Sequence, residues 1–348
     1  MKKNIVNNFN NFFIAEIGTN HNRKKSIVKK MIKEIAKSGC QCVKYQIYEP
    51  DEIVNKKIMV SDYNLQKFYG NISAHHMFDK YLKTPKKWFP ELINYASRYN
   101  LKTAVTIHGD NGLAWAVKNK LDFIKIASMD HNNFPFLKKA VKTLKVPILV
   151  SLGMAKLEDI NILIKILSKY KYGYGVFHCV SLYPPKSNEL RLKNILFLKK
   201  KYNIPVGFSD HSENNKAALI AKTYGASFFE KHITLNKKMI GPDHAFAINV
   251  KELKNYVAKL IKKNSIRNIK IRFEKLSHRE KIIRKKYLKG LIASKNIKKN
   301  TIIKSDHIKI CRPLGNGIEP KYFGKILGKK IRNSIKQEDN FKNSDFYK

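Results

Sequence analysis

The chain has 348 residues, and its 70 Lys and Arg against 26 Asp and Glu give a formal net charge of +44. A hydrophobic content of 43% is ordinary for a globular protein and predicts a sizeable core in one large or two unequal domains. No apolar run approaches the ~20 residues of a membrane span, so we expect a cytoplasmic protein without a membrane partner. The lysines are spread over every predicted helix, and no nucleic-acid-binding motif interrupts them. Specific nucleic-acid binding is therefore not expected, although the charge should help to attract an anionic substrate.

The four cysteines fit a cytoplasmic protein. They contain no CxxC pair, and three of them lie inside apolar runs. We expect them to be buried thiols that act as small hydrophobic side chains.

The N-terminal part begins with two strands that flank a helix. Residues 12–18 form the first apolar strand, and residues 26–38 have the apolar periodicity of a helix that Gly39 ends. The second strand, 42–47, carries Lys44 and Gln46, whose spacing of two places both on one face. If that face is interior, the charge of Lys44 needs a partner, for which an anionic ligand is favoured over a structural ion pair.

Residues 49–84 form a long, irregular excursion, which we interpret as part of the wall over the active site. Its His75-His76 pair has no accompanying metal-ligand pattern. Thr84-Pro85 is expected to open a helix that runs to about Tyr99, with Pro at the first helical position.

The remaining two-thirds of the barrel region is regular. Six further apolar segments are predicted as strands three to eight: 101–107, 123–128, 146–153, 174–181, 206–212 and 228–234. Helices lie between them, as at 217–224 before Gly225. Eight strands with helical connections predict an α/β fold, a (β/α)₈ TIM barrel over residues 1–260. The polar residues come late in each strand, where such barrels carry their active sites.

A linker of residues 261–284 and a small β-rich domain of residues 285–348 are predicted to follow the barrel. Residues 288–294 and 308–312 read as short strands. About sixty residues are few for independent stability, so this tail should pack on a barrel, its own or a partner's.

Two imidazoles end adjacent strands, and they suggest a metal site. His211 and His232, with the carboxylates of Glu16, Asp210, Glu230 and Asp243 nearby, suit a divalent cation. Mn²⁺ or Mg²⁺ is favoured over Zn²⁺, because the pattern contains neither a third His nor a Cys that could serve as a zinc ligand. Lys44, Lys125 and three serines could bind a phosphate opposite the metal. The pattern suggests a phosphorylated substrate joined to, or split from, a metal-polarised carbonyl compound.

Together, these strings resemble the bacterial sialic acid synthase family, which includes N-acetylneuraminate, legionaminic acid and pseudaminic acid synthases. The strings are Ala15-Glu16-Ile17-Gly18 with Asn20-His21, Lys44-Tyr45-Gln46, Gly153-Met154-Ala155, His178-Cys179 with Ser181 and Tyr183-Pro184, Gly207-Phe208-Ser209-Asp210-His211, Glu230-Lys231-His232-Ile233-Thr234 and Gly241-Pro242-Asp243-His244. In the tail, Ala293-Ser294 and Arg312-Pro313 with Gly317-Ile318 resemble that family's C-terminal antifreeze-like (SAF) domain.

The resemblance implies a metal-dependent condensation of phosphoenolpyruvate with the open-chain aldehyde of an N-acetylated hexose, giving a nine-carbon 2-keto acid and phosphate. It implies that His211 and His232 hold the metal, and that Glu16 or Glu230 positions the attacking water. Asp243 and Tyr183 complete the candidate catalytic residues. The implied substrate-binding residues are Lys44, Gln46, Lys125, Ser128, Ser151, Ser181, Ser209 and Lys289. A homodimer in which each tail caps the partner's barrel is also implied.

Three departures from the family pattern put the acceptor sugar in question. Ile107-His108 follows Thr106 where the family usually shows Thr-Pro-Phe, and Met129-Asp130 follows Ser128 where it usually shows Ser-Gly-Glu. The family's sugar-contacting arginine is expected to be replaced near Lys289, and a lysine cannot reproduce a bidentate arginine contact. N-acetylmannosamine is the first acceptor to test, with precursors of legionaminic or pseudaminic acid as alternatives.

Two other functions remain open on the sequence alone. A metal-free aldolase or lyase on the same barrel would need a Schiff-base lysine and would be insensitive to a chelator. A catalytically dead sugar- or nucleic-acid-binding barrel would bind without releasing phosphate, although the intact cluster of Glu16, Lys44, Gln46, His211 and His232 argues against it.

Overall fold

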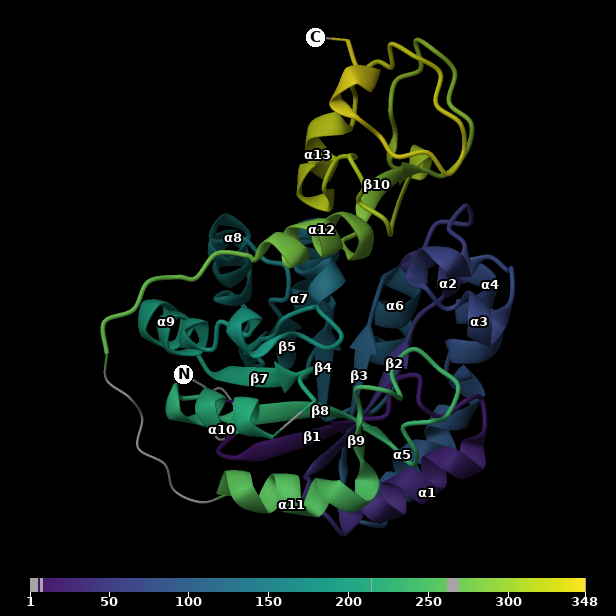
Figure 1. The fold of residues 1–348 in the computed structure, drawn as a ribbon. Helices are drawn as coiled ribbons and strands as arrows, with labels where there is room; N and C mark the ends of the chain where they lie inside the picture. Colours follow the sequence, from purple (N-terminus) through teal and green to yellow (C-terminus); the bar gives the residue numbers. More distant parts are fainter. Residues whose placement is uncertain (1–5, 7–8, 214, 262–268, 348) are drawn as a thin grey trace.

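The computed structural model describes residues 6, 9–213, 215–261 and 269–347. Parallel strands β1 to β8 pair in chain order, and β1 also pairs with β8, so this part of the chain forms a closed barrel (Figure 1). The strand bounds are β1 Phe12–Glu16, β2 Cys42–Ile47, β3 Lys102–Ile107, β4 Phe123–Ile126, β5 Ile148–Ser151, β6 Tyr174–His178, β7 Val206–Asp210 and β8 Phe228–Thr234. The predicted TIM barrel is confirmed.

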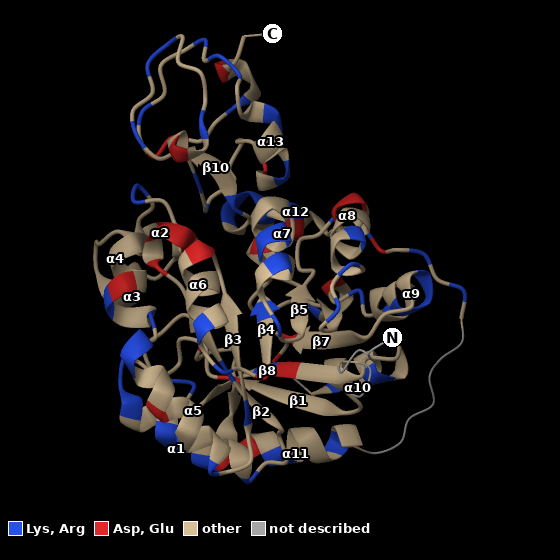
Figure 2. Cartoon of the chain, turned by 180° about the vertical axis from the view of Figure 1, so that it is seen from behind, with Lys and Arg blue, Asp and Glu red and all other residues tan. Residues whose placement is uncertain are grey.

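Helices surround the barrel and bury one apolar face each against the strands. The helices that follow strands are α1 Lys25–Ala36, α5 Phe89–Ser97, α6 Asp110–Lys118, α7 Phe134–Thr143, α8 Leu157–Leu167, α9 Lys193–Tyr202, α10 Lys216–Thr223 and α11 Val250–Ile261. Figure 2 shows Lys and Arg on helices all around the barrel and on the tail. None of the described helices is long and apolar enough to span a bilayer.

The barrel interior changes from apolar to polar along its axis. The lower layer is an apolar cluster that includes Ile14, Cys42 and Phe123. Two residues further along the same strands lie Glu16, Lys44 and Lys125, which share their interior face, because strand side chains alternate. The interior positions nearest the carboxyl ends of these strands are therefore polar, and the predicted site lies at that end of the barrel.

Close packing in the lower layer explains one motif glycine. A Cβ built on Gly207 would lie 2.2 Å from Cδ2 of Phe228, whose ring is fully buried in that layer. Any larger residue at this position would displace the ring or the strand. All four cysteines are buried and unbridged, as expected.

The excursion between β2 and α5 is built of short helical turns, and it rises beside the barrel mouth (Figure 1). Its elements are α2 Pro50–Ile53, a 3₁₀ turn, Val60–Tyr63, α3 Gln66–Tyr69, α4 Ala74–Met77 and a π-helical turn, Phe78–Leu82. The expected helix start at Pro85 is wrong. A 3₁₀ turn occupies Lys86–Trp88, and α5 begins at Phe89. Pro90 lies in the first turn of α5, where a backbone N–H would have no partner within the helix, so proline is tolerated there.

The tail packs over the carboxyl ends of the strands (Figure 1). Residues 262–268 of the predicted linker lie outside the described residues, and the linker's last residues belong to α12, His278–Tyr287. Two antiparallel strands follow, β10 Gly290–Ala293 and β11 Ile308–Cys311. The backbone of Arg312 bonds with Ile53 and Asn55 of the excursion, so the tail and the excursion form one wall.

Candidate active site

A cavity of about 330 Å³ opens at the carboxyl ends of the barrel strands. This volume is within the usual range of ~300–1,000 Å³ for small-molecule sites. The barrel, the excursion and the tail each contribute part of its wall. The predicted site residues that line the cavity are Glu16, Lys44, Gln46, Lys125, Ser128, Ser151, Ser181, Tyr183, Ser209, His211, Glu230, His232 and Asp243. Of the predicted set, Lys289 alone is outside the cavity wall.

Two lysines and two glutamates form a buried ionic cluster at its base. Lys44 Nζ lies 2.5 Å from Glu16 Oε2 and 3.5 Å from Glu230 Oε2, while Lys125 Nζ lies 2.5 Å from Glu230 Oε1. All four side chains are less than a tenth exposed. Glu16 and Lys44 face each other across β1 and β2, so the strand register itself sets this pairing. The charges balance, which makes the burial of each one tolerable.

Neighbouring hydrogen bonds complete the cluster. Lys44 Nζ donates to Thr106 Oγ1 at 2.7 Å, and Ser209 Oγ donates to Glu230 Oε1 at 3.1 Å. Gln46 Nε2 donates to Glu16 Oε1 at 2.9 Å. The sequence pattern flagged the region around Thr106 only as a departure, and its contact with Lys44 depends on the β2–β3 register.

The two glutamates differ in acidity. Burial raises the pKa of Glu16 against the opposing effect of Lys44, and the nearby Glu230 adds to the rise. Burial alone would also raise the pKa of Glu230, but Lys125 and then Lys44 lower it to about 2. Burial opposes the charge of Lys44, yet Glu16 and Glu230 raise its pKa above the ordinary value. Lys44 and Glu230 therefore stay charged at neutral pH, while Glu16 is the carboxylate that takes up a proton more readily.

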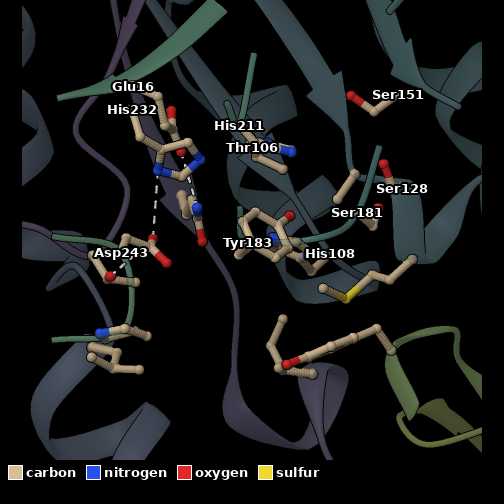
Figure 3. Close-up of a pocket in the computed structure, with 18 of the residues that line it drawn as sticks. Glu16, Thr106, His108, Ser128, Ser151, Ser181, Tyr183, His211, His232 and Asp243 are labelled. Carbon is tan, nitrogen blue, oxygen red and sulfur yellow. Dashed lines mark hydrogen bonds and ion pairs between the residues drawn. The ribbon is translucent and has the colours of Figure 1, made fainter. Parts of the chain in front are cut away.

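Three serine hydroxyls gather on one side of the cavity (Figure 3). Among the described residues, the hydroxyls of Ser151 and Ser181 are buried without a hydrogen-bond partner, whereas Ser128 Oγ accepts from Gly153 N at 3.1 Å. A Cβ on Gly153 would lie 2.3 Å from Ser181 Oγ and 2.6 Å from Ser128 Oγ, so glycine is required for this approach. Buried hydroxyls without a protein partner are free to donate to a polar ligand or an ordered water.

The two imidazoles lie side by side, with ring centroids 5.7 Å apart. His211 Nδ1 lies 2.9 Å from the carbonyl oxygen of Val180, to which it can donate, leaving the Nε2 lone pair free. Burial lowers the pKa of His211 to about 4, and burial together with the neighbouring His211 lowers that of His232 well below its ordinary value. Both rings are therefore neutral at pH 7, the form in which imidazole binds a metal.

These residues fit a divalent cation in part. His211 and His232 offer two nitrogen ligands, and His232 Nδ1 is buried without a hydrogen-bond partner among the described residues. The described residues contain no ready-made group of three or more His, Cys, Asp or Glu ligands. A cation held here would need water or substrate oxygens for its remaining positions, as Mn²⁺ and Mg²⁺ accept.

Asp243 and Tyr183 lie on the mouthward side of the imidazoles. Asp243 Oδ2 is 3.6 Å from His232 Nδ1 and accepts from Thr19 Oγ1 at 3.1 Å (Figure 3). Burial raises the pKa of Asp243 to about 6. The Tyr183 ring packs 4.5 Å from that of His211, centroid to centroid, and half of this tyrosine remains exposed. These side chains can contact a ligand that enters from the mouth.

Lys289 and Arg312 have different places from those expected. Lys289 is buried with its Nζ 2.8 Å from Asp130 Oδ1, so its ammonium pairs with a carboxylate and does not line the cavity. Arg312 lines the cavity instead, and its guanidinium lies over the rings of Tyr63, Phe78 and Tyr287. In the sequence, Arg312-Pro313 was part of the resemblance to the SAF domain. Only the docking of the tail on the barrel shows that the Arg312 side chain reaches the cavity.

Two other motif histidines are structural. His21 Nε2 lies 2.9 Å from Thr84 Oγ1, and His244 bonds with Thr234 and Asn22. His21 thus joins the loop after β1 to the end of the excursion, His244 joins that loop to the end of β8, and neither imidazole lines the cavity.

Family models and related proteins match this chain over nearly its full length. The sequence profile of the NeuB family matches residues 31–270, and that of the SAF domain matches residues 289–346. The chain is 32% identical to the N,N'-diacetyllegionaminic acid synthase of Campylobacter jejuni, over 97% of this chain and 99% of that protein. It is 30% identical to the pseudaminic acid synthase of the same organism, over 98% and 99%. The crystal structure of the spore coat polysaccharide biosynthesis protein spsE from Bacillus subtilis has the same fold, with a TM-score of 0.81 at 24% identity over 97% and 95% of the two chains.

Proposed function

This chain belongs to the NeuB family, and from that premise we propose that it joins phosphoenolpyruvate to the open-chain aldehyde of an N-acetylated hexose. The products would be a nine-carbon 2-keto acid and phosphate. As a NeuB-family synthase, the chain is an enzyme that condenses phosphoenolpyruvate with a hexose. The observation that carries the proposal is one cavity holding paired lysines and glutamates, unpartnered serine hydroxyls and two neutral imidazoles.

Phosphoenolpyruvate would occupy the base of this cavity. Lys44 and Lys125 supply fixed positive charge, and the hydroxyls of Ser151 and Ser181 supply directed donors that have no protein partner. Ser128 and Ser209, already bonded, would complete the wall around the anion. Because the charges are in place before substrate arrives, binding requires little rearrangement.

The glutamates would have separate roles. Glu230 holds both lysines and remains ionised, so it positions the cations that neutralise the leaving phosphate. Glu16, whose pKa is raised, would accept the proton of the water that attacks C2 after the carbon–carbon bond has formed. Gln46 Nε2 donates to Oε1 of the same carboxylate and would hold it in place.

His211 and His232 would hold the Mn²⁺ or Mg²⁺ ion, which when bound polarises the acceptor's carbonyl oxygen. Burial keeps both rings neutral before the metal arrives, so no proton has to leave them. Asp243 and Tyr183, on the mouthward side, would orient the acceptor together with Gln46.

The acceptor is proposed as an N-acetylated hexose, with N-acetylmannosamine the first to test. The diacetylated precursors of legionaminic and pseudaminic acids are alternatives, because synthases of those acids are about 30% identical to this chain. Lys44 does not suit the nucleophile of a Schiff-base aldolase, because its raised pKa keeps the amine protonated.

We also propose that two subunits exchange tails. Within one chain the tail already supplies Arg312 and Tyr287 to the cavity wall, and a partner's tail would supply the same groups in an exchanged dimer. Light scattering that gave a monomer with full activity would exclude the exchange.

Phosphate release from phosphoenolpyruvate tests the function. We expect release only when the acceptor and Mn²⁺ are present, with none in excess EDTA. Tight Mn²⁺-dependent binding of phosphoenolpyruvate without release would move the search to the modified acceptors. If the protein neither releases phosphate nor binds phosphoenolpyruvate, the assignment is contradicted.

A further inference from the structure

The three departures from the family pattern meet at one point in the structure. Asp130, fully buried, lies between Lys289 and the ring of His108: its Oδ1 is 2.8 Å from Lys289 Nζ, and its Oδ2 is 3.5 Å from His108 Nδ1. Lys289 also donates to the backbone carbonyl of His108. One residue comes from the end of β3, one from the turn after β4 and one from the tail. Residues that look like separate changes in the sequence therefore form a single cluster.

His108 has unused hydrogen-bonding capacity at the cavity wall. It lines the cavity and is only 3% exposed, yet among the described residues neither ring nitrogen has a hydrogen-bond partner. Asp130 Oδ2 has none either, so a small movement would let Nδ1 donate to it. Burial lowers the pKa of His108 to about 4 and keeps the ring neutral. In that tautomer Nε2 presents a lone pair.

The position of His108 along β3 indicates which substrate it would meet. Thr106 contacts Lys44 in the ionic cluster, and His108 lies two residues further toward the mouth, a step of about 6–7 Å along an extended chain. Its ring packs against that of Tyr48, centroid to centroid 5.8 Å, and the tail residues Tyr287 and Arg312 line the same cavity. A group that reaches His108 would therefore belong to the second substrate.

We propose that His108 is a specificity-determining residue that accepts a hydrogen bond at Nε2 from an N–H or O–H group of the acceptor hexose. Asp130 holds the tautomer and Lys289 holds Asp130, so that the tail fixes the orientation of the ring. This inference rests on the proposed function. It predicts that acceptors without a hydrogen-bond donor at the matching position bind more weakly, because the buried Nε2 lone pair would then have no hydrogen bond.

The test measures binding without turnover. A reduced acceptor, N-acetylmannosaminitol, has no carbonyl and can be titrated calorimetrically into the protein loaded with Mn²⁺ and phosphoenolpyruvate. His108→Leu removes the lone pair at similar size, His108→Gln restores a polar group, and His76→Leu is the matched control on an exposed histidine outside the cavity. Titration of phosphoenolpyruvate into each Mn²⁺-loaded variant reports whether the base of the cavity is intact.

We expect His108→Leu to weaken hexitol binding by about 5–150-fold, the equivalent of one unmet buried hydrogen bond. His108→Gln should recover part of that loss, and the affinity for phosphoenolpyruvate should change by less than about twofold in all three variants. Equal hexitol affinity in wild type and His108→Leu would overturn the inference, as would a wild type that binds phosphoenolpyruvate but no hexitol. A wild type that fails to bind phosphoenolpyruvate would instead refute the proposed function, and the inference with it.

Discussion

Replacing Lys289 with Met tests whether the buried pair with Asp130 holds the tail to the barrel. Both side chains are at most 1% exposed, and Nζ lies 2.8 Å from Oδ1. Without Lys289, the side chain of Asp130 keeps, among the described residues, Asn133 at 3.3 Å and the neutral ring of His108 at 3.5 Å. An uncompensated buried charge typically costs 3–5 kcal/mol, so we expect Lys289→Met to lose about that much unfolding free energy. A native protein has only ~5–15 kcal/mol in total, so the loss would be easily measured.

The double variant separates charge from packing. Asp130→Asn alone leaves Lys289 buried without an anion and should cost a similar amount. Lys289→Met combined with Asp130→Asn removes both charges, so it should recover at least about 2 kcal/mol relative to the sum of the single losses. Urea denaturation followed by circular dichroism gives these values. Lys139→Met is the matched control, because its pair with Asp110 is exposed and should contribute no more than about 1 kcal/mol.

The pair should also depend on pH in a defined direction. Burial would raise the pKa of Asp130, but Lys289 and then His108 together lower it below the ordinary value of 3.8. A carboxylate whose pKa is lowered on folding stabilises the protein above its unfolded pKa, and that stability is lost as pH falls below it. The stability difference between wild type and Asp130→Asn should therefore shrink below about pH 4. A Lys289→Met loss no larger than that of Lys139→Met would refute the reasoning.

Three further predictions concern the cavity. His232→Ala should weaken Mn²⁺ binding at least about 10-fold, measured by titration calorimetry, and should abolish metal-dependent phosphate release. Lys125→Met should raise the dissociation constant of phosphoenolpyruvate by about 10–150-fold, the equivalent of a lost charge-assisted hydrogen bond. Arg312→Lys should raise the KM for the acceptor while leaving phosphoenolpyruvate binding unchanged, because lysine cannot reproduce the planar stack over three aromatic rings. An equal rise in both constants would show that Arg312 acts on the whole site.

Sequence reasoning located the base of the site because the barrel makes it periodic. Glu16 and Lys44 are polar residues near the ends of apolar strands, and in a closed barrel such positions converge at one mouth. Strand order was enough to bring them together. Their partners within the cluster, such as Thr106, depend on the register between strands, which the pattern alone does not supply.

The mouth of the site was less predictable because its residues come from segments whose docking is irregular. Arg312 reaches the cavity through backbone bonds to Ile53 and Asn55, roughly 260 residues away in sequence. A further buried network, in which Arg284 bonds with Glu319 and Asp159, fixes the tail on the barrel. No periodicity links these positions, so the sequence did not predict that Arg312 lines the cavity while Lys289 is buried beside Asp130.

Depth along the barrel explains why the two ends of the cavity can diverge independently. Thr106 belongs to the ionic cluster, where loss of its hydroxyl would remove one hydrogen bond from the buried ammonium of Lys44, so substitution there is costly. In the described part of the chain, no hydrogen bond or ion pair joins the side chain of His108, two residues on, to that cluster, and its neighbours Asp130 and Lys289 balance each other's charge. Exchanging all three together preserves neutrality while replacing the polar surface that faces the second substrate. The chemistry of phosphoenolpyruvate can thus stay fixed in a barrel whose acceptor is chosen by a cluster shared between β3, the turn after β4 and the tail.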